Sequence, residues 1–360
     1  MKYVIFYCLF TLLSTNIQSQ DTTVQEKLKM NVSGFLDVFY VYDFNTPKGE
    51  SRQPFLYNHN RHHEFNLNLG IIKANIIHSK YRANLAVHSG TYVNDNYAAE
   101  PGLLKNISEA NIGIALHKNK NIWLDAGIFS SHIGFESAIS ADNWTLTRSI
   151  LAENSPYYLS GAKVTYEPSA KWTVIALVCN GWQRIRRVEG NHLLSLGTQL
   201  TYKPSENILV NWSTFFGTDD PDTLRRMRYF NNFYMQWSIS PQFGVIAGLD
   251  IGWQQKSYKS AAFDKWWSPV IILQYKLNSK WKTAFRCEYY QDASGVIIST
   301  VSKEGFKTSG VSCNLDYNAA TNLFCRVEVR YMQSKDDIFE YESSFTNKNI
   351  ILASSLALKF

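Results

Sequence analysis

The 360-residue chain is 45% hydrophobic and 14% aromatic, and its formal net charge at pH 7 is +6. This positive charge is modest and spread along the sequence, and no stretch resembles a nucleic-acid-binding module, so we do not expect nucleic acid as a partner. No Pro/Ser-rich tract, charge block or low-complexity run divides residues 30–360, which favours one large domain over two.

The first twenty residues, "MKYVIFYCLFTLLSTNIQSQ", have the pattern of a secretory signal peptide. Lys2 supplies the early positive charge, an apolar run follows from Tyr3 to Leu13, and Ser19 is a suitable cleavage residue. The apolar run is too short to be a membrane-spanning helix. We therefore predict a signal peptide over residues 1–19 and an exported domain over residues 20–360.

The rest of the chain consists largely of segments of about ten residues in which apolar and polar side chains alternate. In "WKTAFRCEYYQ", for example, Trp281, Phe285 and Tyr289 share one face, and Lys282 and Glu288 share the other. This pattern predicts sixteen strands, near residues 32–43, 64–78, 81–91, 108–117, 122–129, 158–167, 172–182, 193–203, 208–217, 229–239, 243–254, 269–277, 281–291, 306–317, 323–334 and 349–360.

The connections between these strands alternate strictly between short and long. The same tight hairpin pattern occurs three times, each time with an aromatic residue at a strand end, in "YEPSAKW", "YKPSENI" and "YKLNSKW". Seven short turns, eight long loops and an even strand number predict an all-β fold, a transmembrane antiparallel up-and-down β-barrel of the bacterial outer membrane with its short turns in the periplasm. The aromatic residues at the strand ends would form a girdle at the membrane interface.

The last ten residues, "ILASSLALKF", support a closed barrel. Leu352, Leu356 and Leu358 alternate with small or polar residues up to the terminal Phe360, which would leave an unpaired apolar edge in a soluble sandwich. Closure satisfies this edge in lipid, so we expect the last strand to pair with 32–43 and 323–334. A terminal Phe after alternating apolar residues also resembles the signal that barrel assembly machinery recognises.

The four cysteines beyond the signal peptide, Cys179, Cys287, Cys313 and Cys325, follow no metal-ligand spacing. Three of them share the apolar phase of their strands, so we favour free thiols that face lipid over a disulfide.

Along nearly all of its mature length, the sequence resembles the OmpL-like β-barrel porin-2 family of Bacteroidota. The resemblance rests on "SGFLDVFYVYDFN" at 33–45, on "GFESAISADNWTLTRSILAENSPYY" at 134–158, on the following "SGAKVTY", and on the terminal strand. It implies passive diffusion of small hydrophilic solutes across the outer membrane, and it implies no particular solute. Trimeric porins are a precedent for sixteen strands, so a homo-oligomer and a monomer both stay open.

Charged residues in the inward phase of the strands are candidates for the wall of a water-filled channel. Arg286, Arg326 and Arg330 lie on two neighbouring predicted strands and could form a positive wall that faces Asp37 or Asp125. The alternative is that the charges pair across strands and only hold the wall together. The full set of candidate wall residues is Asp37, Arg82, Asp125, Arg286, Glu288, Arg326, Glu328 and Arg330.

The long third loop is the candidate constriction, because its mixture of polar, aromatic and charged residues suits a segment that folds into the lumen. The residues that we expect to line the constriction are Asp142, Asn143, Trp144, Arg148, Glu153 and Tyr157. The alternative is that the loop caps the barrel and that these groups tie it to the wall.

Two other functions were weighed, an enzyme and a closed receptor or adhesion barrel. The histidines in "YNHNRHH", His59, His62 and His63, could suggest a metal site or a base, but no partner at ligand spacing and no nucleophile motif accompanies them. We therefore expect a surface histidine loop, with no catalytic residue, metal or cofactor. A receptor barrel would have the same strands and a closed lumen.

Expected partners follow from the predicted location in the outer membrane. They are outer-membrane lipid, the barrel assembly machinery and small solutes. The basic stretches "QRIRRVEGN" and "LRRMRYF" lie in predicted outer loops, where they could bind lipopolysaccharide phosphates or attract anions, although a solvated loop face is the plainer interpretation.

Overall fold

Strands built from the alternating segments make up most of the structure. The computed structural model describes residues 28–49, 51–300 and 302–360, so the predicted signal peptide lies outside the described residues. The barrel strands are β1 (Lys29–Asp43), β2 (Phe65–Ile77), β3 (Tyr81–Ser89), β4 (Ile107–Ala115), β5 (Asn121–Ser130), β6 (Tyr158–Ser169), β7 (Trp172–Cys179), β8 (Ser195–Ser205), β9 (Ile208–Gly217), β10 (Arg228–Ser238), β11 (Phe243–Gln255), β12 (Phe263–Lys276), β13 (Trp281–Asp292), β14 (Phe306–Ala320), β15 (Leu323–Ser334) and β18 (Lys348–Lys359).

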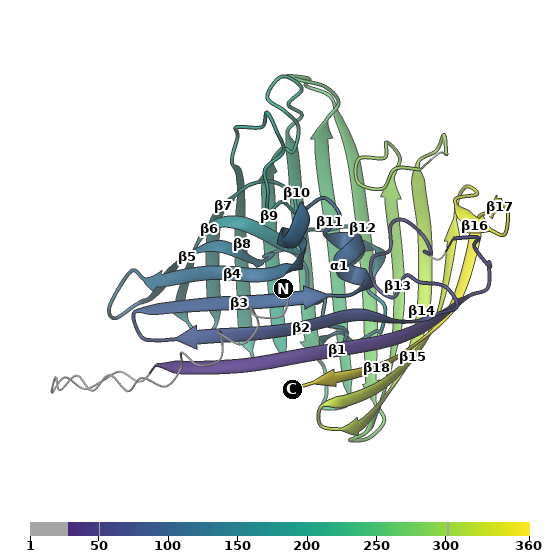
Figure 1. Ribbon diagram of the computed structural model, residues 1–360, viewed down its shortest axis with the longest axis horizontal. Helices are drawn as coiled ribbons and strands as arrows, with labels where there is room; N and C mark the ends of the chain where they lie inside the picture. Colours follow the sequence, from purple (N-terminus) through teal and green to yellow (C-terminus); the bar gives the residue numbers. More distant parts are fainter. Residues whose placement is uncertain (1–27, 50, 301) are drawn as a thin grey trace, which may run out of the picture.

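These sixteen strands of the described chain form one closed antiparallel barrel in which sequence neighbours are spatial neighbours, except where β18 pairs with β15 and β1. The predicted closed barrel is thus confirmed. Figure 1 shows the near strands β1 to β4 running across the far strands β9 to β12, as expected when strands tilt around a barrel.

The two ends of the chain meet at the seam of the barrel. Phe35 lies opposite Lys359, and the backbone of Phe360 exchanges two hydrogen bonds with Gly34, with N–O distances of 2.7 and 2.9 Å. The Phe360 ring covers Gly34, where a Cβ would lie only 2.4 Å from it. Glycine at position 34 therefore leaves room for the terminal aromatic ring on the outer face.

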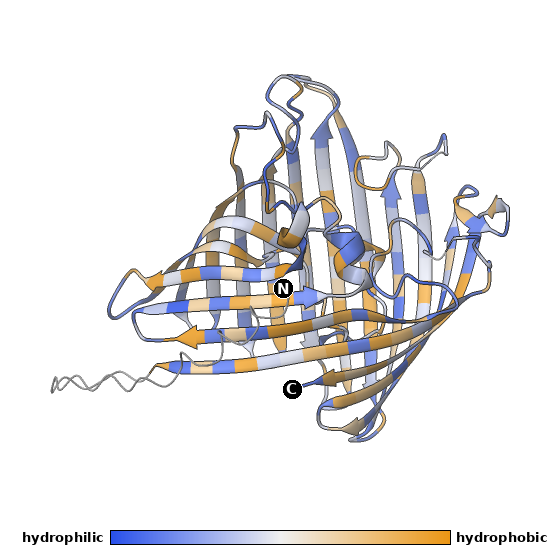
Figure 2. Ribbon diagram, viewed as in Figure 1, coloured by the Kyte–Doolittle hydropathy of each residue, from blue (hydrophilic) through white to orange (hydrophobic). Residues whose placement is uncertain are grey.

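The alternation of side chains separates two faces of the wall. In β18, Leu352 and Leu356 are 40% and 52% exposed on the outer face, while Ala353 and Ala357 are buried inside. Figure 2 shows the same banding of apolar and polar residues along the strands. The four cysteines from 179 onward are free thiols.

Strand bounds agree with the sequence to within a few residues, apart from the start of β12, which begins at Phe263 and not at 269. Proline cannot donate to the sheet ladder, so Pro269 is an unusual residue inside a strand. The strand nevertheless runs through Pro269, which lies opposite Leu249 on β11, and the hydroxyl of Ser268 donates to the Tyr289 carbonyl at 2.7 Å on the β13 side.

The seven short turns lie at one end of the barrel and the eight long connections at the other. Outward aromatic rings gather at the short-turn end, where Trp172 stacks on Tyr202 with centroids 4.2 Å apart and Trp281 lies 4.7 Å from Tyr317. This arrangement matches a membrane-interface girdle. Of the helices in the described chain, none has the length and apolar character needed to cross a membrane.

Three of the long connections bear on the barrel interior: loop 1 (44–64), loop 2 (90–106) and loop 3 (131–157). Loop 2 contains α1 (Thr91–Asn96) and η1 (Gly102–Asn106), loop 3 contains η2 (Ser140–Asp142) and α2 (Ile150–Glu153), and the connection before β18 folds into a small hairpin, β16 (Phe339–Tyr341) with β17 (Ser344–Thr346). Phe55 of loop 1 is buried 4.7 Å from Phe306 of β14. The loops thus supply much of the buried apolar core.

Candidate functional site in the barrel lumen

On strands β13 to β15, the inward arginines are buried and each is paired with a carboxylate. Arg286 lies 2.9 Å from Glu328, Arg330 lies 2.6 Å from Glu288, and Arg326 lies 2.7 Å from Asp316. The predicted positive wall is therefore wrong on this side, because carboxylates on β13, β14 and β15 neutralise the guanidinium groups. The strands of Arg286 and Arg330 are also not the neighbours that we predicted, since β14 lies between β13 and β15 and the two ion pairs that join them reach across it. All of these side chains point inward, which is the phase that the sequence indicated.

Loop 3 is hydrogen-bonded to these same charges. The Thr147 backbone N–H donates to Glu328 at 2.6 Å, and the Ile150 N–H donates to Glu288, also at 2.6 Å. Arg286 in turn donates to the Thr147 carbonyl at 2.6 Å. Because charge-assisted bonds of this kind are strong, loop 3 is held firmly against strands β13 to β15.

Arg148 connects loops 1, 2 and 3. Its guanidinium lies 2.7 Å from Glu153, 3.5 Å from the Tyr157 ring centroid and 5.2 Å from that of Tyr92 in α1. Glu153 also accepts the backbone N–H groups of residues 57 and 58 in loop 1, at 3.1 and 3.2 Å. Burial disfavours the charged guanidinium, but the Glu153 carboxylate outweighs this and raises the pKa of Arg148.

The other predicted constriction residues do not gather around Arg148. Asp142 pairs with Lys359 at 2.6 Å near the end of the chain, and Asn143 exchanges hydrogen bonds with the backbone of Ser137. The Trp144 ring lies against Gly244 at the start of β11. The six residues are thus spread along loop 3 and do not form a ring, and a constriction made by them stays a prediction.

His59 is a buried residue and not part of a surface histidine loop. Its Nε2 lies 2.9 Å from Asp37 on β1, and the Ser140 hydroxyl of loop 3 donates to the same carboxylate at 2.7 Å. The expectation for His59 was wrong because loop 1 turns inward, where Asp37 provides an acceptor. His63 is exposed and bonds to the Tyr40 hydroxyl at 2.6 Å, and His62 is half-buried.

The charges on strands β2 to β6 are arranged differently from those under loop 3. Lys73 lies 2.8 Å from Glu109, and Arg82 donates to Asp125 at 2.6 Å. Lys163 lies over the Phe129 ring at 4.6 Å. The side chains of Lys73 and Arg82 are 32% and 30% exposed, whereas that of Arg286 is fully buried. This side of the inner wall is therefore open to solvent.

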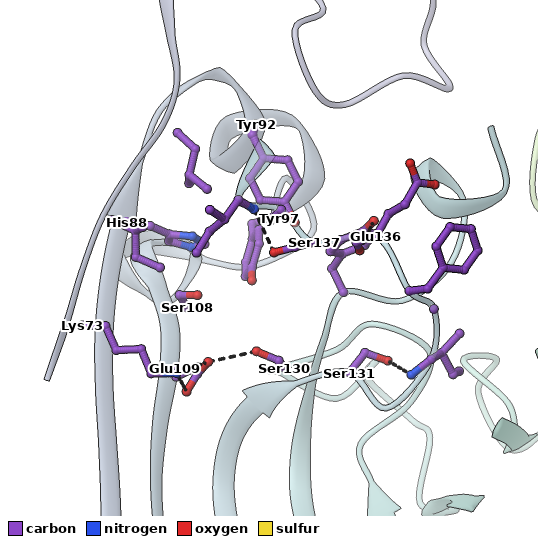
Figure 3. Close-up of a pocket in the computed structure, with 18 residues that line it drawn as sticks. Lys73, His88, Tyr92, Tyr97, Ser108, Glu109, Ser130, Ser131, Glu136 and Ser137 are labelled. Atoms are coloured by element: carbon purple, nitrogen blue, oxygen red, sulfur yellow. Dashed lines mark hydrogen bonds and ion pairs between the residues drawn. The ribbon is translucent and has the colours of Figure 1, made fainter. Parts of the chain in front are cut away.

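A cavity of about 300 Å³, called the inner cavity below, separates loop 3 from this open wall. Figure 3 shows Lys73, Glu109 and Ser130 along one side of it, with Tyr92 and Tyr97 of loop 2 at another and Glu136 and Ser137 of loop 3 opposite. The hydroxyl of Ser130 donates to Glu109 at 2.9 Å. Polar groups from the wall thus face the loops across open space.

Burial shifts the pKa values of two titratable groups in loop 3. Burial raises the pKa of the Glu136 carboxyl, against the attraction of Arg286 and the hydrogen bonds from Ser149. Burial also lowers the pKa of His132 to about 4, although its Nε2 bonds to the Thr214 carbonyl at 2.8 Å. His132 is therefore neutral at pH 7, and its Nε2–H is the donor in that bond.

No cluster of three or more potential metal ligands occurs among the residues that the structure describes. The Asp37 group resembles parts of a catalytic triad, but the Ser140 hydroxyl donates to Asp37 and not to His59, so the imidazole is not placed to activate it. The roles of Glu136, Thr147 and His59 in these contacts were not predicted from the sequence, because no local pattern shows what a loop residue will contact.

A family described as "Putative beta-barrel porin-2, OmpL-like" matches residues 29–360. No curated protein matches the chain. Among solved structures, an anion-selective porin from Comamonas acidovorans is similar with a TM-score of 0.62 at 7% identity, covering 93% of this chain and 100% of the porin. The outer membrane channel DcaP of Acinetobacter baumannii has a TM-score of 0.60 at 9% identity, covering 93% and 98%. OmpT of Vibrio cholerae has a TM-score of 0.57 at 9% identity, covering 92% and 98%. At such identities the structures show a shared fold.

Proposed function

Because the chain belongs to this porin family of the bacterial outer membrane, we propose that small hydrophilic solutes cross it passively along the β2 to β6 side of the lumen. The observation that carries this path is the contrast in exposure between the two inner walls. Lys73 lines the inner cavity and is 32% exposed, and Arg82 on the next strand is 30% exposed, while the arginines of β13 to β15 are buried under loop 3.

The charged side chains on the β2 to β6 wall have a small positive excess, and Glu136 of loop 3, which faces the same cavity, is buried with a raised pKa. Lys73, Arg82 and Lys163 contribute three cations against the carboxylates of Glu109 and Asp125. Fixed charges on the wall of a narrow aqueous pore favour counter-ions. We therefore expect a weak preference for anions, and long, charged or bulky solutes should be slowed at the inner cavity.

The proposed orientation places the short turns in the periplasm and the long loops outside the cell. We further propose that the chain acts without catalysis and needs no cofactor. Barrel assembly machinery and lipopolysaccharide are proposed partners, and a homo-oligomer is compatible with the fold.

Lys163→Gln tests the path, because Lys163 lies over the Phe129 ring and makes no ion pair in the described chain, so its loss breaks no direct ion pair. We expect the reversal potential in a planar bilayer under a salt gradient to shift toward cation preference. The matched control is Lys259→Gln in the loop after β11, which removes the same charge from an exposed site and should leave the reversal potential unchanged. Equal reversal potentials for both variants and the wild type would contradict the proposed path.

A closed receptor barrel is the second candidate, and one observation favours it. Phe55 and Leu56 of loop 1 are buried in an apolar cluster with Phe306 and Phe339, which fills part of the lumen on the long-loop side. A wild-type barrel that inserts into bilayers and passes no current would support this candidate over the channel.

A further inference from the structure

The short-turn end of the barrel carries a ring of exposed lysines, called the lysine ring below. Its members come from strand ends and turns all around the barrel: Lys29, Lys80, Lys118, Lys120, Lys171, Lys203, Lys276, Lys280 and Lys359. Glu167 and Glu206 are the acidic side chains that the described residues place in the turns at the same end. Within the described residues, only Lys359 of this ring makes an ion pair, with Asp142.

At the opposite end of the barrel the long loops contain many carboxylates beside their cations, and several of these groups form ion pairs. Arg61 pairs with Asp95 at 2.7 Å, Arg226 with Asp220 at 2.8 Å, and Lys335 with Glu304 at 2.8 Å. Among the described residues, the excess of cations over carboxylates is therefore largest at the short-turn end. A ring of cations with few carboxylates nearby attracts anionic partners.

Five members of the lysine ring sit next to outward aromatic residues of the girdle. The neighbouring pairs are Lys80 and Tyr81, Lys171 and Trp172, Lys203 and Tyr202, Lys276 and Tyr275, and Lys280 and Trp281. In each pair the aromatic residue lies on the strand side and the lysine on the turn side. Tyr275 and Trp281, for example, are 48% and 38% exposed on the outer face.

This repeated order fixes the depth of the ammonium groups in a membrane. Girdle aromatics sit at the level of the lipid headgroups, and a turn lysine one residue farther from the hydrocarbon, such as Lys80, Lys171 or Lys280, can extend its long stem to the phosphates. Lys203 and Lys276 lie at the ends of β8 and β12 in the lumen phase, so they add positive charge on the inner side of the same rim. A partner approaching from the periplasm, such as the cell wall, would meet the lysines but would give no reason for an outward aromatic beside each one.

We propose that the lysine ring binds the phosphates of anionic phospholipid in the inner leaflet of the outer membrane. The assignment rests on the membrane location and orientation proposed above, and it does not depend on conduction. Each ammonium near an anionic surface strengthens the attraction about fivefold. The ring would thus collect anionic lipid around the periplasmic rim and set the vertical position of the barrel.

The test uses the full chain in bilayers of phosphatidylethanolamine that contain a minor fraction of phosphatidylglycerol. Brominated phosphatidylglycerol and brominated phosphatidylethanolamine are compared as quenchers of tryptophan fluorescence, since Trp172 and Trp281 lie on the outer face beside the ring. The rim variant changes Lys80, Lys171, Lys203, Lys276 and Lys280 to Gln. The matched control makes the same change at five lysines of the long-loop end, Lys48, Lys105, Lys256, Lys259 and Lys335.

The preference for phosphatidylglycerol should fall about fivefold or more in the rim variant and stay at the wild-type value in the control. An equal fall in both variants would mean that net charge alone matters and would overturn the proposal. An unchanged preference in the rim variant would also overturn it. If the rim variant keeps its lipid preference but no longer sediments with isolated peptidoglycan, the ring serves the cell wall and the lipid assignment is wrong.

A second variant with fewer substitutions tests the proposal if the rim variant does not assemble. Lys171→Gln with Lys280→Gln neutralises two turn lysines beside the outward-facing Trp172 and Trp281, and the same fall in preference, reduced in size, is expected. Conductance measured on the same samples separates this proposal from the channel. A barrel that conducts like the wild type while losing its lipid preference supports the lysine ring, and a silent barrel that keeps the preference contradicts only the channel.

Discussion

Replacing Arg148 by Ala should loosen the junction of loops 1, 2 and 3. The Arg148 and Glu153 side chains are both 1% exposed and lie 2.7 Å apart. Without Arg148, the Glu153 carboxylate keeps only the backbone N–H groups of Tyr57 and Asn58 as partners in a buried site. Breaking a buried ion pair by removing one member costs about 3–5 kcal/mol, and the loss of the stacked Tyr157 contact adds to this.

Separation of the loops can relieve this cost, because it lets water reach Glu153. We therefore expect single-channel recordings of Arg148→Ala to show a higher or noisier conductance and a shift toward cation preference. The control is Arg226→Ala in the loop before β10, where Arg226 pairs with Asp220 at 2.8 Å and is 43% exposed. An exposed pair is worth about 0–1 kcal/mol and is screened over about 10 Å at 0.1 M salt, so the control should behave like the wild type.

A double variant distinguishes a mechanical role from a purely electrostatic one. If Arg148 and Glu153 act as a latch between the loops, Arg148→Met with Glu153→Leu should restore part of the wild-type conductance, because an apolar pair can replace a buried ion pair, although the N–H groups of Tyr57 and Asn58 lose their acceptor. If the charge of Arg148 acts directly on ions, Glu153→Leu alone should shift selectivity in the opposite direction. Identical conductance and reversal potential for Arg148→Ala, Arg226→Ala and the wild type would refute both roles.

Three other predictions concern orientation, closure and pH. A peptide tag inserted near Asp220 or Asn347 should be labelled on intact cells and one near Ser205 should not, so surface labelling at Ser205 would reverse the proposed orientation. Deleting Phe360, or changing it to Asp, should lower the amount of heat-modifiable barrel in the outer membrane, because the ring that covers Gly34 at the seam is lost; wild-type levels would argue against this role. Burial holds the pKa of His132 at about 4, and its buried Nδ1 has no acceptor among the described residues. The neutral form of His132 therefore stabilises the fold above pH 6.5. This stability is lost as the pH falls toward 4, by up to about 3 kcal/mol. Channel recordings should therefore become noisier between pH 6.5 and pH 4 in the wild type, with little pH dependence in His132→Gln.

The barrel itself could be predicted because the alternation and turn lengths that specify it lie in short stretches of the sequence. A period of two along "WKTAFRCEYYQ" determines which side chains face lipid, and in a membrane only closure satisfies the edge that β18 would otherwise leave open. Turn lengths then determine the order of strands. The start of β12 at Phe263 was missed, and the strand continues through Pro269, a residue that is rare inside strands.

The interior was decided by contacts between residues far apart in the sequence. Alternation shows that Arg286 and Arg330 point inward, but it cannot show that Glu328 and Glu288 neutralise them or that Thr147 and Ile150 complete the network. Loops have no period from which their path can be read, and the path depends on which buried donors find acceptors. The inward turn of loop 1 is the clearest case, because His59 is buried only where the fold brings Asp37 of β1 and Ser140 of loop 3 to one point.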